Sequence, residues 1–162
     1  MWHLAVMALV LSEHSPVPLD LSRVIGMVLV HDLVEIDAGD AFVYDEAARA
    51  AAPAKERAAA ERIFGILPAD QRDWLRGLWD EFEEKQTAEA RFAGAIDRLQ
   101  PMMMNATADG GGWARHGITA DRVIDKNSVI DAGAPDLWAV ARQVIEHAVE
   151  DGVLAPAPAG EG

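Results

Sequence analysis

The stretch of this sequence that decides its interpretation is HDLVEIDAGD, residues 31–40, which directly follows an apolar run at residues 24–30. The stretch holds five acid–base or metal-binding side chains: His31, Asp32, Glu35, Asp37 and Asp40. Side chains of these types are seldom fully buried unless they are paired or bind a metal. Because the preceding run predicts a buried segment, the cluster needs a compensating positive charge, and a divalent cation is the simplest candidate.

Helical spacing brings these side chains together. If residues 19–36 form one helix, His31 and Glu35 lie four positions apart on one face. Asp32 is about 100° round the helix from His31, close enough to share a metal with it near a helix end. Asp40 then falls in the following loop. A histidine nitrogen with carboxylate oxygens suits Mn, Co, Fe, Zn or Mg and does not select among them.

Asp97 is the second polar residue that needs an explanation. The other residues on its helical line are small or apolar: Ala90, Ala93, Pro101 and Met104. Arg98, beside it, is expected to belong to another face. An aspartate in this position is either salt-bridged within the core or a metal ligand that meets His31 and Asp32. The residues alone leave both interpretations open.

Length and composition limit the class of protein. The chain has 162 residues, 51% of them hydrophobic, which fits one domain with a sizeable core. Its formal net charge of −13 makes sequence-independent binding of nucleic acid polymers unfavourable, although a bound metal would still permit a mononucleotide. The absence of cysteine excludes disulfides and thiolate zinc sites and is compatible with a cytoplasmic protein.

The hydrophobic pattern predicts an all-α fold with about six main helices, because period-two alternation is missing. The expected helices span residues 2–14, 19–36, 45–65, 68–85, 87–108 and 137–152, with a shorter one at 119–126 and then a loop. Pro53 is expected to break or kink the third helix. Residues 1–154 are predicted to form one helical domain and residues 155–162 a disordered tail.

The N-terminal residues superficially resemble a signal peptide. They lack a cationic start and a convincing small-residue cleavage site. The apolar run at residues 4–11 is too short to span a bilayer. We expect a central helix buried on all sides, and no membrane partner.

The string HDLVEIDAGD, with an aspartate far downstream in the segment FAGAIDRLQP at residues 92–101, resembles the HD-domain metal-dependent phosphohydrolases. The branch to which it is most similar is that of the bacterial 5'-deoxynucleotidases, and the resemblance extends to about Gly152. It implies a divalent metal held by His31, Asp32 and Asp97, and metal-assisted hydrolysis of a nucleoside or deoxynucleoside 5'-monophosphate.

The resemblance also implies roles for two further carboxylates. Glu35 would position the attacking water and accept its proton, and Asp40 would help to protonate the departing sugar oxygen. Asp37 is expected at the loop surface. Tyr44 and Trp113 are each either base-stacking or packing residues. A homodimer is expected from the family.

The first helix departs from the family pattern. Related sequences carry a string similar to Glu-His-Ser-Trp-His there, and Met1 stands at the serine, so the metal-binding histidine would precede the first residue. The expectation is a chain that is N-terminally truncated relative to the family, begins at a misassigned start or has lost this ligand. His3, one turn further along the same face, is a candidate substrate-binding residue or else a core histidine.

Three other functions stay open. A catalytically impaired HD-type nucleotide-binding or scaffold protein would agree with the missing histidine. A di-iron oxygenase on the same scaffold would need more histidine and carboxylate ligands than the five histidines here supply. A plain helical interaction domain would leave the cluster at residues 31–40 unexplained.

Overall fold

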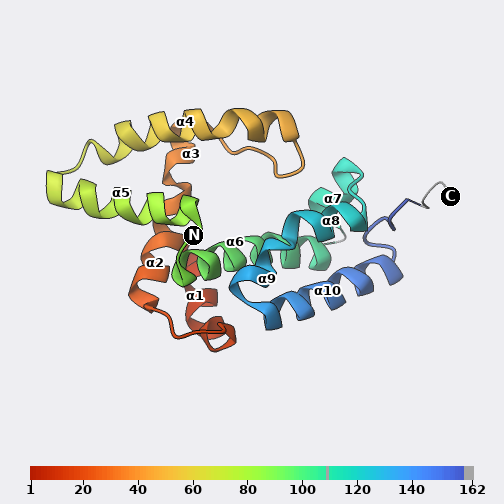
Figure 1. The fold of residues 1–162 in the computed structure, drawn as a ribbon. Coiled ribbons are helices and arrows are strands. Elements are labelled where there is room, and N and C mark those ends of the chain that lie inside the picture. Colours follow the sequence, from red (N-terminus) through yellow and green to blue (C-terminus); the bar gives the residue numbers. More distant parts are fainter. Residues whose placement is uncertain (109, 159–162) are drawn as a thin grey trace.

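Helices account for most of the part of the chain that the computed structural model describes, residues 1–108 and 110–158 (Figure 1). The elements are α1 (Trp2–Leu11), η1 (Ser12–His14), α2 (Leu21–Val30), η2 (His31–Val34), α3 (Glu35–Ala38), α4 (Glu46–Phe64), α5 (Ala69–Glu84), α6 (Ala88–Thr107), α7 (Gly111–His116), α8 (Ala120–Asn127), α9 (Val129–Gly133) and α10 (Pro135–Glu150), where η marks a 3₁₀ helix. Within the described residues there is no strand, so the all-α prediction is confirmed.

The six longest helices correspond to the six that the sequence predicts, and polar side chains define where several of them begin. Asp20 accepts hydrogen bonds from the backbone N–H groups of the first turn of α2. Asp45 does the same at α4, and Thr87 at α6. Such caps satisfy amide donors that have no partner within the helix, which is why these residue types mark helix starts.

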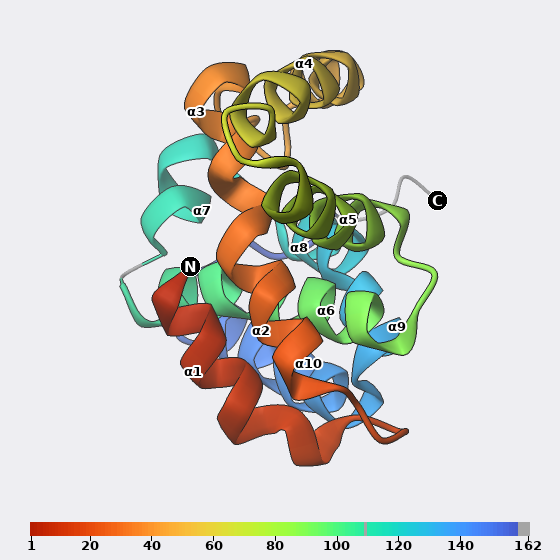
Figure 2. The ribbon, with the colours of Figure 1, turned by 90° about the vertical axis from the view of Figure 1, so that its left-hand side faces the viewer.

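The centre of the fold is α6, which has eight buried residues and contacts α1, α2, α5, α9 and α10 (Figures 1 and 2). The short helix α9 packs closely against it. A Cβ at Gly133 would lie 2.3 Å from the carbonyl oxygen of Arg91, so a residue without a side chain is required at this crossing. The helices α4 and α5 both pack against η2; α4 also covers α3, and α5 packs on α2 and α6.

The prediction of a central, fully buried first helix is wrong. α1 packs against α2 and α6 through Leu4 and Ala8. Its opposite face is open, with Trp2 78% and Val10 64% exposed. Apolar residues all round a helix indicated burial on every side, but here half of that surface faces outward.

Three other boundaries differ from those predicted. The second helix does not continue to residue 36, because α2 ends at Val30 and the 3₁₀ turn η2 follows. Pro53 does not break α4, which runs through it with Pro53 on an exposed face. The loop expected after Lys126 contains the helix α9.

The end of the chain is more ordered than predicted. Ala155, where the tail was expected to begin, bridges to Thr119, and its carbonyl oxygen accepts a hydrogen bond of 2.9 Å from the Ala120 N–H. Residues 156–158 have no regular secondary structure, and the rest of the predicted tail, residues 159–162, lies outside the described residues.

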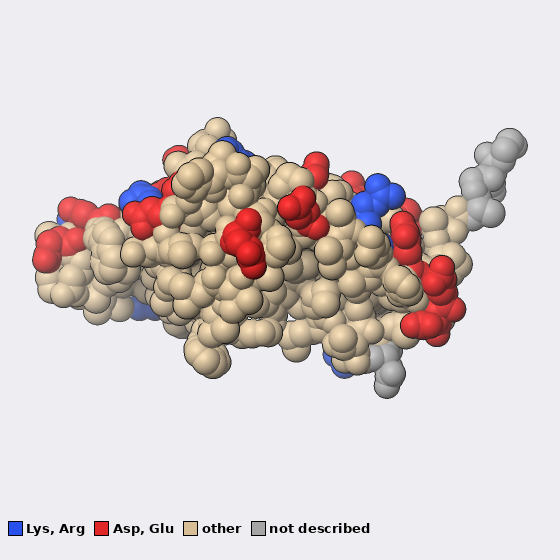
Figure 3. Space-filling view, turned by 90° about the horizontal axis from the view of Figure 1, so that it is seen from below, with Lys and Arg blue, Asp and Glu red and all other residues tan. Residues whose placement is uncertain are grey.

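The surface carries the acidic character of the composition. Figure 3 shows one face on which red Asp and Glu side chains outnumber blue Lys and Arg side chains, separated by wide areas of other residues. In the described ranges, no helix combines the length and the apolar character that crossing a membrane requires.

Candidate metal centre and active site

The change from α2 to η2 positions the first donor residues. The His31 N–H still bonds to the carbonyl oxygen of Met27, so the chain keeps its direction while its winding tightens. In a 3₁₀ helix, residues three apart stack on one face. His31 and Val34 accordingly face the core, whereas Asp32 and Glu35 are only partly buried. The predicted pairing of His31 with Glu35 on one α-helical face is therefore replaced by a 3₁₀ arrangement.

His31 brings two carboxylates together. Its Nε2 lies 2.9 Å from Oδ1 of Asp32 and 3.1 Å from Oδ1 of Asp97, which comes from α6, 66 residues away. The imidazole packs on the ring of Phe82 with centroids 4.4 Å apart. Among the described residues, its Nδ1 is buried without a hydrogen-bond partner. The structure thus joins the three residues that the sequence predicted as a group.

A protonated His31 offsets part of the negative charge of the two carboxylates. Burial acts to lower the pKa of His31, but its hydrogen bonds to Asp32 and Asp97 outweigh that effect and raise the pKa to about 9. Burial acts to raise the pKa of Asp97, yet the hydrogen bond to His31 holds it below its ordinary value. The ring therefore carries a proton at neutral pH, and a metal at Nε2 must displace that proton.

The donor chemistry fits a divalent cation, because one nitrogen and carboxylate oxygens suit such ions. Ligands at right angles around a cation ~2.1 Å away lie about 3 Å apart, close to the 2.9 and 3.1 Å separations at His31 Nε2. Across residues 1–108 and 110–158, however, no three His, Cys, Asp or Glu side chains are already arranged to hold an ion. Binding would require the hydrogen bonds between His31 and the carboxylates to open.

Glu35 and Asp40 lie beside this group. Burial and the negative charges of Asp32 and Asp40 raise the pKa of Glu35 to about 7. Asp40 follows Gly39, whose φ of 79° ends α3 in a conformation that favours glycine. Both carboxylates line the same cavity as His31.

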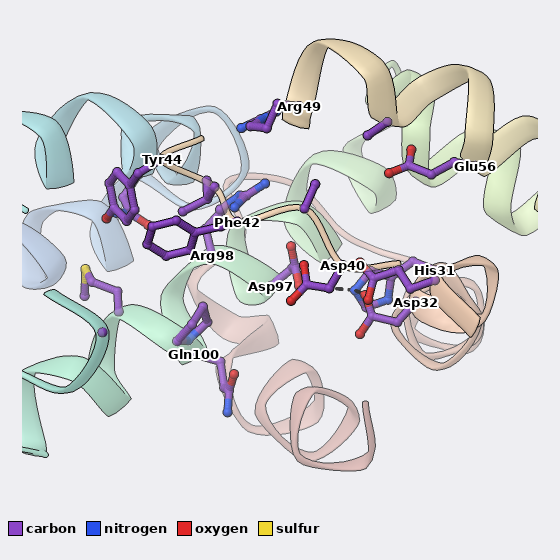
Figure 4. A pocket seen from close by; sticks show the side chains of 18 of the residues that line it. His31, Asp32, Asp40, Phe42, Tyr44, Arg49, Glu56, Asp97, Arg98 and Gln100 are labelled. Atoms are coloured by element: carbon purple, nitrogen blue, oxygen red, sulfur yellow. Dashed lines mark hydrogen bonds and ion pairs between the residues drawn. The ribbon is translucent and has the colours of Figure 1, made fainter. Parts of the chain in front are cut away.

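This cavity, of about 550 Å³, has two chemically different ends (Figure 4). Asp32, Asp40 and Asp97 gather with His31 at one end, and Phe42 and Tyr44 lie at the other. The two aromatic rings meet edge to face at 5.3 Å between centroids. Trp113 also lines the cavity and is 2% exposed. The volume lies in the range of small-molecule sites.

Two other predicted positions lie outside the cavity. His3 is exposed and does not line it, but its Nδ1 is 3.4 Å from Nε2 of Gln100, which does. Asp37 lies on the surface, as expected, and forms an ion pair with Arg62. A role of His3 in substrate binding stays a prediction.

Several residues of the cavity were not predicted. Arg98 was expected on another face of its helix, but it lines the cavity beside Asp97. A stripe of α4 also contributes: Arg49, Ala52, Pro53 and Glu56. Their spacing of three, four and seven residues is that of one helix face, and this spacing is the signal in the sequence that could have identified them.

The HD domain family matches residues 1–138, and the chain belongs to this family. The resemblance carried by residues 31–40 and 92–101 is therefore confirmed. Among curated relatives, 5'-deoxynucleotidase HDDC2 of Xenopus laevis is 33% identical over 103 residues, which cover 64% of this chain and 50% of that protein. The Homo sapiens protein of the same name is 32% identical, with 64% and 49% covered. The chain thus spans about half the length of these relatives.

A solved structure is similar along almost the whole chain. It is the crystal structure of a predicted metal-dependent phosphohydrolase from Magnetospirillum magnetotacticum MS-1, with a TM-score of 0.88 and 45% identity. The match covers 96% of this chain and 79% of that one.

Proposed function

We propose that the protein is a divalent-metal-dependent phosphohydrolase that converts nucleoside or deoxynucleoside 5'-monophosphates into nucleoside and phosphate. The single observation that carries this proposal is the meeting of His31, Asp32 and Asp97 at one end of a cavity whose other end is aromatic. The names of the relatives, 5'-deoxynucleotidase and metal-dependent phosphohydrolase, support the same reaction class.

In this proposal His31, Asp32 and Asp97 hold the cation. When bound, a divalent metal of this kind supplies Lewis acidity toward a phosphoryl oxygen and toward water. Three protein donors leave further positions for other ligands, as catalysis requires. The donor set admits Mn, Co, Mg, Fe or Zn, so the metal must be identified by experiment.

Glu35 and Asp40 move the protons. Glu35 accepts a proton from the water whose oxygen attacks phosphorus, and its pKa of about 7 suits a group that takes up and releases protons at neutral pH. Asp40 helps to protonate the 5'-oxygen as the bond between phosphorus and oxygen breaks, and the proton that Glu35 takes from the water balances the one delivered there. Phe42 and Tyr44 lie where they would contact the base or sugar.

A phosphate-release assay tests this function directly. The chain is incubated with each ribo- and deoxyribonucleoside 5'-monophosphate and with Mn, Co, Mg, Fe or Zn in turn. We expect release with at least one metal, and none when His31 is replaced by alanine. The proposal fails if titration shows that a metal binds and yet no monophosphate is hydrolysed.

The alternative of a catalytically impaired nucleotide-binding or scaffold protein is not favoured, because the relatives are named as hydrolases. A titration of the same metal-loaded chain separates the two functions. Tight nucleotide binding without phosphate release would support the alternative.

We also propose that the protein forms a homodimer and works in the cytoplasm. The open face of α1, with Trp2, Leu9 and Val10 exposed, offers apolar surface for a second copy. Light scattering after size-exclusion chromatography tests the dimer, and Val10→Glu should weaken it. A monomeric mass at every concentration would contradict the dimer.

A further inference from the structure

A second cavity lies behind the proposed metal centre and has the opposite electrostatic character. Its volume is about 480 Å³. It is bounded by the start of α4, the end of α5, and the helices α6, α8 and α9. Five basic residues line it: Arg49, Lys85, Arg91, Arg98 and Lys126. Only two acidic residues, Glu83 and Asp97, do so, and Asp97 is already engaged by His31.

This concentration of positive charge is unusual for the chain. The whole sequence has 14 Lys and Arg against 27 Asp and Glu, yet five of the 14 line one cavity. All half-buried basic residues except Arg76 line this cavity. Arg76 is balanced by ion pairs with Asp80 and Glu61.

Among the described residues, the basic residues of the cavity other than Lys126 lack such partners. In the described part of the chain, Lys85, Arg91 and Arg98 form no ion pair with a carboxylate. Lys126 pairs with its sequence neighbour Asp125, at 3.4 Å between Nζ and Oδ2. Arg91 donates from Nη1 to the carbonyl oxygen of Gln86 at 2.7 Å, which leaves its other donors unused. Half-buried cations without counter-charges are costly, so an external anion would stabilise them.

Lys85 is the most constrained of these residues. It ends α5 with a left-handed backbone at φ 54°, and its Nζ stands 3.0 Å from the centroid of the Phe82 ring. A Cβ at residue 94 would lie 3.0 Å from the Lys85 Cε, so Gly94 leaves the room that the side chain occupies. The backbone and the packing therefore keep the amine at the cavity rather than in solvent.

We propose that this cavity binds a phosphate-bearing anion at a site separate from the phosphate that is hydrolysed. Three arginines offer planar pairs of donors that match phosphate oxygens, and two lysines add charge. Arg49 and Arg98 line both cavities, so the two sites are neighbours; Figure 4 shows Arg98 between Tyr44 and Asp97, with Arg49 above them at the start of α4. The occupant is either inorganic phosphate or the phosphate group of a nucleotide.

The site goes beyond the proposed function and can be tested without it. The chain is titrated with inorganic phosphate by calorimetry, both as purified and with EDTA present, at constant ionic strength. With EDTA the acidic end of the first cavity has no cation to attract an anion, so saturable binding reports the basic cavity. We expect one phosphate per chain under this condition.

Matched double variants separate the site from overall charge. Arg91→Gln with Lys126→Gln removes two residues that line only the basic cavity, whereas Lys55→Gln with Arg142→Gln removes two exposed cations that line neither cavity. The first pair should weaken phosphate binding at least about tenfold, because hydrogen bonds to charged groups are lost. The second pair should retain binding, and Arg91→Lys, which keeps the charge but loses the paired donors, should bind phosphate more weakly than wild type and more tightly than the first pair.

Two results would overturn the proposal: no saturable binding with EDTA, or equal weakening in both double variants while circular dichroism shows both folded. A deoxynucleoside monophosphate titrated in the same buffer distinguishes the sources. Tighter binding of the nucleotide than of phosphate identifies a nucleotide as the occupant, and equal binding identifies free phosphate. Because no metal and no turnover are involved, a failed hydrolase assay leaves this result intact.

Discussion

The two elements that supply the proposed metal donors are built in opposite ways. α6 is a regular helix of 20 residues with eight of them buried, and it offers one carboxylate, Asp97. The segment of residues 31–40 changes from a 3₁₀ turn to one short α-helical turn and then to a loop. It offers the other two donors, His31 and Asp32, and the two proton-transfer carboxylates, Glu35 and Asp40. His31 is buried in it, but Asp40 is exposed.

From this difference we infer that α6 supports the site rigidly, whereas the segment at residues 31–40 can adapt. A packed helix keeps Asp97 in place because moving it would disturb the core. The segment at residues 31–40 has fewer buried residues and can shift when the hydrogen bonds between His31 and the carboxylates open. We therefore expect substitutions in α6 to change stability, substitutions in the segment to change catalysis, and Asp97 to be the exception.

Asp97→Asn should have the largest effect on activity. The amide keeps the volume but loses the charge that meets His31, so metal affinity and phosphate release should both fall, the latter to background. Metal titration and the phosphate-release assay measure this. Asp37→Asn, which removes a carboxylate paired with Arg62 outside the cavity, is the control and should leave turnover unchanged. If Asp97→Asn retained turnover, α6 would contribute no donor to the proposed metal centre.

The regular element is also the one whose bounds could be predicted. Apolar residues at helical spacing defined α6 to within a residue at each end. The place of Asp97 was visible only as a polar residue on an apolar line. What it meets could not be read from spacing, because His31 lies 66 residues away and no local rule links the two.

For the irregular segment at residues 31–40, the sequence predicted which residues belong to the site but not their geometry. The 3₁₀ turn at His31–Val34 and an α-helix share the same apolar spacing over four residues, so periodicity could not distinguish them. α9 was missed because five residues ending in Gly133 are too few for a periodic signal. Pro53 was given too much weight, since an exposed helix position lets water satisfy the carbonyl group left without a donor.

Glu35→Gln tests whether the segment at residues 31–40 acts in catalysis. We expect kcat to fall by roughly 10²–10⁴-fold, the usual loss when a general base is removed, with little change in metal affinity. Glu56→Gln is the comparison, because Glu56 lines the same cavity from α4 and also has a pKa raised by burial. It should lose much less activity. Equal losses in the two variants would mean that Glu35 has no special position.

Phe92→Ala in α6 and Ile36→Ala in the segment at residues 31–40 test how much each element contributes to stability. Phe92 on α6 is 0% exposed, and its truncation should lower the free energy of unfolding by about 3–5 kcal/mol. Ile36 in α3 is 73% exposed, and its truncation should change that free energy by less than ~0.5 kcal/mol. Urea unfolding followed by tryptophan fluorescence measures both. Similar losses would contradict the distinction between a supporting and an adaptable element.

The smallest expected effect concerns Glu81, which links α2, the helix that leads into residues 31–40, to the cap of α6. Glu81 on α5 pairs with Arg23 of α2, and its Oε1 accepts a hydrogen bond of 2.5 Å from Oγ1 of Thr87, the cap of α6. Partial burial acts to raise the pKa of Glu81, but the hydrogen bonds from Arg23 and Thr87 outweigh it and hold the pKa below its ordinary value. The folded state therefore favours the ionised carboxylate.

Glu81→Gln should consequently lower stability at neutral pH by up to about 1 kcal/mol, as for a pair that is partly open to solvent. The unfolded chain takes up a proton at Glu81 at a higher pH than the folded chain does, so wild-type stability declines as pH falls through this interval. The difference between wild type and variant should be complete above the ordinary glutamate pKa and vanish below the folded one. Urea unfolding from pH 7 to pH 3 measures it, and a difference that grew with acidity would show that Glu81 does not join α2 to the cap of α6 through its charge.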